Sequence, residues 1–82
     1  MTEKQILDAL TEIFRDVFDD PSLAISADTT AEDIKGWDSV AHINIVVASE
    51  IRFGVKFKTS EIEELKNVGE FVKLIQKRSN AS

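Results

Sequence analysis

Apolar residues recur at spacings of three and four in three separate segments of this chain. That period gathers them on one face of an α-helix, whereas a half-buried strand would alternate apolar and polar residues. The pattern predicts helices over residues 3–18, 39–53 and 68–78, with a core where their apolar stripes meet. The stripe positions are Ile6, Leu10, Ile13, Phe14 and Val17, then Val40, Ile43, Val46, Val47 and Ile51, then Val68, Phe71, Val72 and Ile75.

Residues with capping chemistry stand at the expected ends of these helices. Thr2 is followed three residues later by Gln5, which is the spacing of a capping box. The carboxylate of Asp38 can accept from the free N–H groups that open the second helix. Gly54 can adopt the left-handed conformation that ends it. These signals favour a helix over a strand for the β-branched run 43–48.

A fourth, short helix is expected between the second and third long ones. Ser60 and Glu63 have the spacing of another capping box, which predicts this helix over 60–65. Before it, Val55 and Phe57 alternate with lysines, as in an extended segment. No second segment offers a convincing strand to pair with it, so we expect an extended connector with these two apolar side chains tucked in.

Residues 19–38 form one long connection between the first two long helices. Pro21 cannot continue the first helix, and its ring disfavours the helical conformation for the residue before it. A connection of this length in a small domain is either functional or held down by its own apolar residues. Leu23, Ile25 and Ile34 are such residues, and we expect them to pin the loop to the helices.

Together these elements predict an all-α fold. We expect a small antiparallel four-helix bundle, with three longer helices, one short helix and a long loop between the first two. The 82 residues suffice for one domain, so residues 1–82 are expected to form a single unit. Its polar end, residues 79–82, is expected to be a frayed tail.

Charge and composition exclude several classes of function. The formal charge is −5, which disfavours nucleic acid as a partner because phosphate backbones require lysines and arginines. No apolar run approaches the roughly 20 residues of a membrane span, so no membrane insertion is expected, and no secretory signal opens the chain. The chain has no cysteine, which excludes disulfides and fits a reducing compartment. We expect a cytoplasmic monomer.

The motif Gly36-Trp37-Asp38-Ser39-Val40 joins the long loop to the second helix. If Asp38 is the N-cap, Ser39 lies in the first turn, beside the positive end of the helix dipole. A phosphate ester on Ser39 would be stabilised there. Taken alone, the pentapeptide is also an ordinary helix start, so its flanks decide the interpretation.

With those flanks, the sequence resembles the acyl carrier protein family. That family carries an Asp-Ser-Leu motif at the start of its second helix, a Glu near the end of that helix and a Phe-Gly at its close. The corresponding residues here are Asp38-Ser39-Val40, Glu50 and Phe53-Gly54. The resemblance covers nearly all 82 residues. It implies that Ser39 bears a 4′-phosphopantetheine arm and that Asp38 is both cap and recognition residue.

The resemblance also implies the partners. A phosphopantetheinyl transferase would move the arm from coenzyme A to Ser39 with Mg²⁺, and that metal belongs to the transferase step, so no metal site is expected in this chain. Acyl-activating or ketosynthase-type enzymes would dock around the second helix. The docking candidates are Trp37, Val40, Ile43, Asn44, Val47 and Glu50.

Two departures from the family pattern favour a specialised discrete carrier over the housekeeping fatty-acid carrier. The second helix of the family commonly carries several acids, but here Asn44 stands where a typical fatty-acid carrier has Glu. Trp37 before the motif is also unusual for a housekeeping carrier. If the cargo is sheltered between the helices, Val47, Ile62 and Leu65 are candidates to line that space.

The resemblance favours a substrate carrier without catalytic residues of its own, and three alternatives stay open. The first is a peptidyl or aminoacyl carrier of the same fold. The second is a non-covalent helical adaptor with an unmodified Ser39. The third is a small hydrolase, because His42 lies three residues after Ser39 and the two side chains could be neighbours on a helix.

Overall fold

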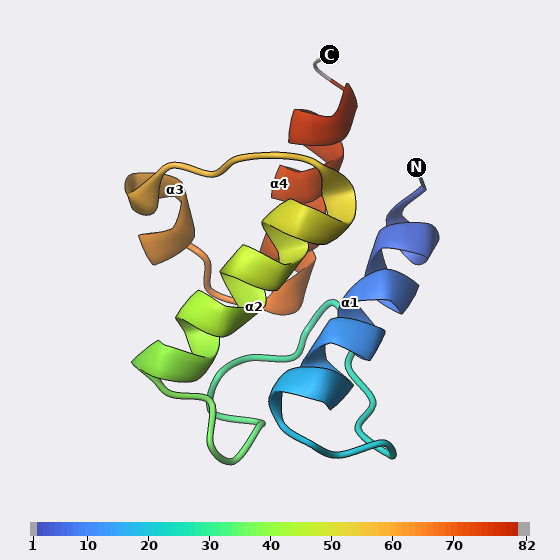
Figure 1. Cartoon of the computed structure of the whole chain (residues 1–82), viewed down its shortest axis with the longest axis vertical. Helices are drawn as coiled ribbons and strands as arrows, with labels where there is room; N and C mark the ends of the chain where they lie inside the picture. Colours follow the sequence, from blue (N-terminus) through green and yellow to red (C-terminus); the bar gives the residue numbers. More distant parts are fainter. Residues whose placement is uncertain (1, 81–82) are drawn as a thin grey trace.

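The computed structural model describes residues 2–80, in which it has four helices and no strand. They are α1 (Glu3–Val17), α2 (Ser39–Phe53), α3 (Thr59–Glu63) and α4 (Val68–Asn80). In Figure 1, α1 runs opposite to α2 and α4, and the short α3 lies to one side of α2. The predicted bundle of three longer helices and one short helix, with a long first connection, is confirmed. None of these four helices is long and apolar enough to cross a membrane.

The core forms where α1 packs against both α2 and α4. The predicted stripe of α4 is buried throughout, and that of α1 is buried except for Val17, which is half-buried at the helix end. The largest fully buried side chains come from all three long helices: Phe14, Ile6, Leu10, Ile45, Ile75 and Val68. Burial of such side chains is the main favourable term in the folding of a domain of this size.

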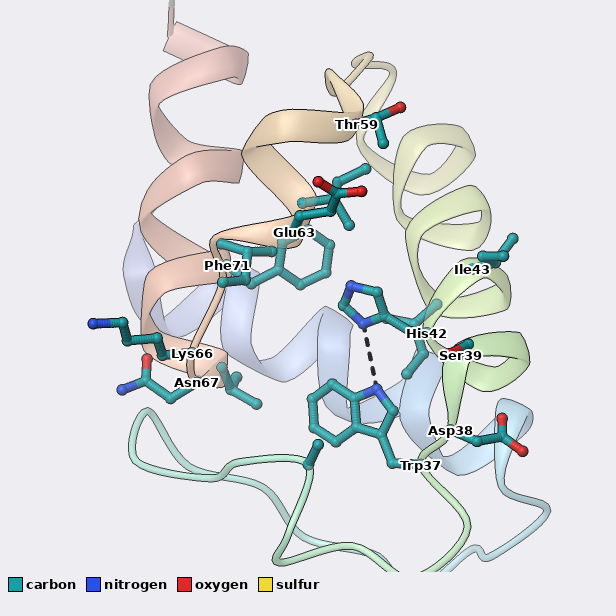
Figure 2. Close-up of a pocket in the computed structure, with 15 residues that line it drawn as sticks. Trp37, Asp38, Ser39, His42, Ile43, Thr59, Glu63, Lys66, Asn67 and Phe71 are labelled. Atoms are coloured by element: carbon teal, nitrogen blue, oxygen red, sulfur yellow. Dashed lines mark hydrogen bonds between the residues drawn. The ribbon is translucent and has the colours of Figure 1, made fainter.

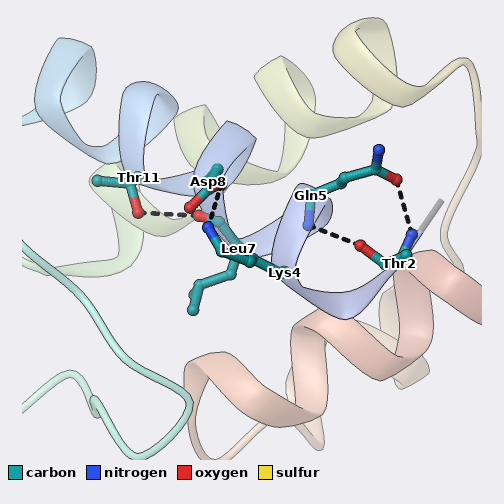
Figure 3. Close-up of polar contacts among 6 residues, drawn as sticks. All are labelled: Thr2, Lys4, Gln5, Leu7, Asp8 and Thr11. Carbon is teal, nitrogen blue, oxygen red and sulfur yellow. Dashed lines mark hydrogen bonds and ion pairs between the residues drawn. The ribbon is translucent and has the colours of Figure 1, made fainter.

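The capping box that opens α1 is confirmed. The hydroxyl of Thr2 accepts from the backbone N–H of Gln5 at 3.1 Å, and the side-chain oxygen of Gln5 accepts from the backbone N–H of Thr2 at 2.9 Å (Figure 3). In the same first turn, Lys4 forms an exposed ion pair with Asp8 at 3.2 Å. An exposed pair of this kind adds little to stability, so the cap and the buried stripe position this helix.

The core face predicted for α2 is wrong except at Val46. The buried residues of α2 are Ala41, Ile45, Val46 and Ser49, whereas Val40, Ile43, Val47 and Ile51 are exposed. The reason is that α2 is apolar almost all the way round, so the spacing alone fits more than one face. The buried Ser49 is tolerated because its hydroxyl donates to the carbonyl of Ile45 at 2.7 Å.

The long loop is pinned to the bundle as expected. Ile34 is buried, and Leu23 and Ile25 pack half-buried against the core. A polar contact adds to this, because the guanidinium Nε of Arg15 on α1 donates to the carbonyl of Leu23 at 2.7 Å.

The same loop also closes the start of α4. The first N–H groups of a helix have no partner within it and need acceptors elsewhere. The carbonyl of Thr29 accepts from the N–H of Val68 at 2.9 Å, and the carbonyl of Ala27 accepts from Gly69 at 2.8 Å. Gly69 permits this approach, since a Cβ there would lie 2.9 Å from the Ala27 oxygen.

The short helix α3 begins earlier and is shorter than the predicted 60–65, and its predicted capping box is wrong. The carboxylate of Glu61 accepts from the N–H of Lys58 at 2.9 Å, so Lys58 is the cap residue and the helix starts at Thr59. Ser60 is therefore already inside the helix and cannot cap it. The connector before α3 is extended as predicted, with Val55 and Phe57 half-buried.

α4 continues to Asn80, two residues beyond the predicted end at 78. The hydroxyl of Ser79 donates to the carbonyl of Gln76 at 3.2 Å, within the last turn. The helix thus includes positions 79 and 80, which the sequence analysis assigns to the tail. Residues 81–82, which complete the predicted tail, lie outside the described residues.

Candidate functional site

Asp38 holds the first turn of α2, as the sequence predicts. Its backbone is extended, and its carboxylate accepts from the N–H of Ala41 at 2.8 Å. Gly36, two residues earlier, has a backbone φ of 91°, which residues other than glycine rarely adopt. This turn directs the chain from the loop into the cap and leaves Ser39, the first residue of α2, exposed.

Trp37 anchors this junction to the core through aromatic contacts. Its ring meets Phe14 edge-on at 5.1 Å between centroids, and Phe18 at 6.5 Å. Such edge-to-face pairs are favourable beyond the area that they bury. Trp37 is half-buried, so its side chain fixes the loop in place and also forms part of the wall beside Ser39.

The indole of Trp37 is also bonded to His42, a contact that the sequence did not predict. The Nε1–H of Trp37 donates to Nδ1 of His42 at 3.3 Å, and the two rings stack at 6.0 Å between centroids, 27° from parallel (Figure 2). No hydrogen bond joins Ser39 to His42 within residues 2–80. This arrangement disfavours the Ser–His hydrolase, because the imidazole is bonded to the indole and not to the hydroxyl that it would activate.

An open groove of about 610 Å³ lies beside Ser39, between α2 on one side and α3 with the start of α4 on the other (Figure 2). Trp37, Asp38, Ser39 and His42 form its rim and near wall. Its apolar lining includes Ile45, Ile62, Leu65, Val68 and Phe71. Ile62 and Leu65 were predicted to line such a space. Val47 was predicted as well, but it is not among the lining residues and lies about half exposed.

The predicted docking residues fall into two groups. Val40, Ile43 and Val47 are 66%, 60% and 48% exposed, and Asn44 beside them is also exposed. Ile51 is 79% exposed and continues this row of exposed apolar side chains along α2. In the sequence, only its spacing of four residues from Val47 indicates that it lies on the same face. An apolar ridge along α2 is thus formed by Val40, Ile43, Val47 and Ile51.

Glu50 and Trp37, by contrast, have structural contacts. The carboxylate of Glu50 accepts from the N–H of Phe57 at 3.0 Å and so holds the connector that follows α2. Trp37 is held by the aromatic contacts described above.

The charged side chains of α2 and of its cap are engaged in contacts. Arg52 near the end of α2 pairs with Glu12 of α1 at 3.1 Å, and Asp38 is the cap. In residues 2–80 no group of three histidine, aspartate or glutamate side chains is placed to hold a metal ion.

Glu61 of α3 is bonded both to the N–H of Lys58 and to the guanidinium of Arg78 on α4. The backbone hydrogen bond first, and the guanidinium second, lower the pKa of Glu61 below its ordinary value.

The start of α2 fits a phosphate ester on Ser39. The hydroxyl is exposed, and the backbone N–H groups of Ser39 and Val40 have no hydrogen-bond acceptor within the part of the chain that the structure describes. Free N–H groups and the positive end of the helix dipole favour a bound phosphate. An attached arm would start at the rim of the groove, where Asp38 and Ser39 both lie.

Comparisons with known proteins give one family and several similar proteins. Residues 8–75 match a family described as "Phosphopantetheine attachment site". The chain is 32% identical to the acyl carrier protein of Thermobifida fusca over 93% of its own length and 96% of that protein. It is also 32% identical to the acyl carrier protein of Acidothermus cellulolyticus, over 92% and 89% of the two chains.

A solved structure is similar as well. The solution structure of holo acyl carrier protein from Geobacter metallireducens superposes with a TM-score of 0.86. It is 45% identical in sequence, and the match covers 93% of this chain and 87% of that one.

Proposed function

This chain belongs to the acyl carrier protein family, and on that premise we propose that it carries acyl groups on a 4′-phosphopantetheine arm attached to Ser39. The observation that carries the proposal is the exposed hydroxyl of Ser39 at the first residue of α2, beside free N–H groups and at the rim of the groove. When bound, the arm supplies a terminal thiol that holds the acyl group as a thioester.

Each neighbouring residue has a part in presenting that group. Asp38 caps α2 and so holds the helical turn that begins at Ser39. Trp37 holds the loop end against Phe14, so the attachment point is rigidly placed. Ile62, Leu65 and Phe71 offer an apolar wall that can shelter an acyl chain from water.

The apolar ridge is the proposed docking surface for partner enzymes, together with Asn44. It starts one residue after Ser39, so an enzyme that reaches the arm also meets the ridge. The proposed partners are a phosphopantetheinyl transferase and cytoplasmic acyl-activating or ketosynthase-type enzymes. Because the ridge is apolar and its neighbouring charges are engaged, we propose a specialised carrier whose partners offer a complementary apolar patch.

The test is intact-mass spectrometry after incubation with coenzyme A, Mg²⁺ and a broad-specificity phosphopantetheinyl transferase. We expect the mass to rise by one arm in the wild-type chain and not at all in Ser39→Ala. Ser60→Ala is the matched control, because Ser60 is also an exposed serine near the start of a helix, and this variant should be modified like the wild type. No gain with several transferases would favour the adaptor with an unmodified Ser39.

A further inference from the structure

The contact between Trp37 and His42 determines which nitrogen of the imidazole carries its proton. An indole N–H can only donate, so Nδ1 of His42 must be the acceptor of the 3.3 Å hydrogen bond. A neutral imidazole has one donor and one acceptor nitrogen. With Nδ1 as the acceptor, the proton of neutral His42 lies on Nε2.

That second nitrogen faces the groove. His42 is half-buried and lines the groove, and in Figure 2 its ring lies above the indole and turns its other nitrogen toward Phe71 and Glu63. No hydrogen bond from Nε2 to another side chain or backbone group is present in residues 2–80. His42 therefore presents an oriented N–H donor to a groove with a mostly apolar lining, and it does so from the helix that also bears Ser39.

We propose that the Nε2–H group of His42 is a hydrogen-bond donor for the cargo and that it selects acyl groups with an oxygen on the chain over saturated ones. This inference rests on the proposed function. A saturated chain that covered Nε2–H would remove it from water without giving it a partner, which is unfavourable. An acyl group with a carbonyl or hydroxyl oxygen near this nitrogen would satisfy the donor. His42 is thus a positioning and specificity-determining residue, and it takes no part in bond making.

The first measurement is the tautomer of His42 in the unloaded protein, from the two imidazole ¹⁵N shifts in a long-range ¹H–¹⁵N correlation spectrum. We expect a protonated Nε2 and an unprotonated Nδ1 at a pH where the ring is neutral. Trp37→Phe removes the indole donor and should let the second tautomer appear. A proton on Nδ1 in the wild-type protein would overturn the inference.

The second measurement compares two cargoes of similar length. The protein is loaded with hydrolysis-resistant pantetheine amides that bear either a butanoyl or a 3-oxobutanoyl group, and loading is checked by intact mass. Groove occupancy is read from the shifts of the Leu65 methyl groups, and solvent protection from the exchange rate of His42 Nε2–H. We expect the 3-oxobutanoyl group to occupy the groove about 2- to 10-fold more than butanoyl, as one net hydrogen bond allows.

Variants of His42 separate the effect of its N–H donor from the effect of its side-chain volume. His42→Phe should abolish the preference for the 3-oxobutanoyl group, whereas His42→Gln keeps an N–H donor and should retain part of it. Equal occupancy by the two cargoes in the loaded wild-type protein would overturn this inference alone. Failure to load Ser39 at all would instead contradict the proposed function, and the inference would fall with it.

Discussion

At the scale of single residues, Asp38 has a structural part that can be separated from any part in recognition. Its carboxylate accepts from Ala41 N–H at 2.8 Å, so Asp38→Ala removes the cap of α2. We expect this variant to lose about 1 kcal/mol of unfolding free energy, the usual value of an N-cap, in urea denaturation. Asp38→Asn keeps a side-chain oxygen that can cap the helix, so it should lose only a few tenths of a kcal/mol of unfolding free energy. Equal losses in the two variants would contradict a capping role.

The sequence predicts Asp38 and Ser39 but not the pairing of Trp37 with His42. A cap residue and the residue after it are defined by the local helix start, which is visible in the chain itself. The Trp37–His42 contact depends on the path of the loop and on the positions of Phe14 and Phe18 in α1. These come from tertiary packing, and a lone histidine three residues after a serine equally suggests a nucleophile pair.

At the scale of helices and loops, the junction between the long loop and α4 leads to a second prediction. Gly69→Ala should destabilise the protein by about 1–2 kcal/mol in urea denaturation, because the new Cβ would lie 2.9 Å from a backbone oxygen that cannot easily move. Lys73→Ala, on the exposed face of the same helix, is the control and should change stability by less than about 0.5 kcal/mol. Helix propensity alone predicts stabilisation by Gly69→Ala, so a more stable variant would refute the proposed close approach.

The contact between α3 and α4 leads to a third prediction, which concerns pH. The folded state lowers the pKa of Glu61, first through the Lys58 N–H and then through Arg78, so it favours the charged carboxylate. The charged carboxylate therefore stabilises the folded state at pH values above 4.5, the ordinary pKa of glutamate. This stabilisation is lost as the pH falls through the lowered pKa of Glu61 in the folded state. Glu61→Gln should therefore be less stable than wild type at about pH 7, and the difference should shrink toward about pH 3.

The control for Glu61→Gln is a neighbouring acid. Glu64→Gln changes an exposed carboxylate whose side chain has no ion pair among the described residues, so urea denaturation should give nearly the same stability as wild type at both pH values. A loss in Glu61→Gln that stays constant with pH would point to altered packing and not to charge.

The buried faces of α1 and α4 can be predicted from the sequence, whereas that of α2 cannot, for a physical reason. The stripes of α1 and α4 are bordered by charged residues, so their buried faces could be identified from spacing. α2 has apolar residues on opposite faces, with Ile45 and Val46 in the core and Ile43 and Val47 in contact with solvent. Only packing against α1 distinguishes these faces, which is why spacing alone predicts the wrong core face for this helix.

At the scale of the whole molecule, the formal charge of −5 and the apolar ridge suggest opposite modes of partner binding. A net negative surface steers partners through long-range attraction, which salt screens. Apolar contact depends little on salt in this range. Since the ridge starts beside Ser39, we propose that apolar contact contributes more than electrostatic attraction to the binding of partner enzymes.

The last prediction distinguishes the two modes. We expect the KM of a broad-specificity phosphopantetheinyl transferase for this chain to change less than about threefold between ionic strengths of about 0.01 M and 1 M, over which the screening length falls about tenfold. Ile43→Ser should raise this KM about tenfold, because it removes the burial of one apolar side chain in the complex. Lys73→Ser on α4 is the control and should leave the KM unchanged.

Ile43 is 60% exposed in the free protein, so urea denaturation should find Ile43→Ser nearly as stable as wild type. A KM that rises tenfold with salt and is insensitive to Ile43→Ser would assign docking to charge. The ridge would then need another explanation, and self-association is the first to test, by sedimentation of the wild type against the same variant. A salt-independent KM that responds to Ile43→Ser would place the transferase on the ridge, within one helical turn of the hydroxyl that it modifies.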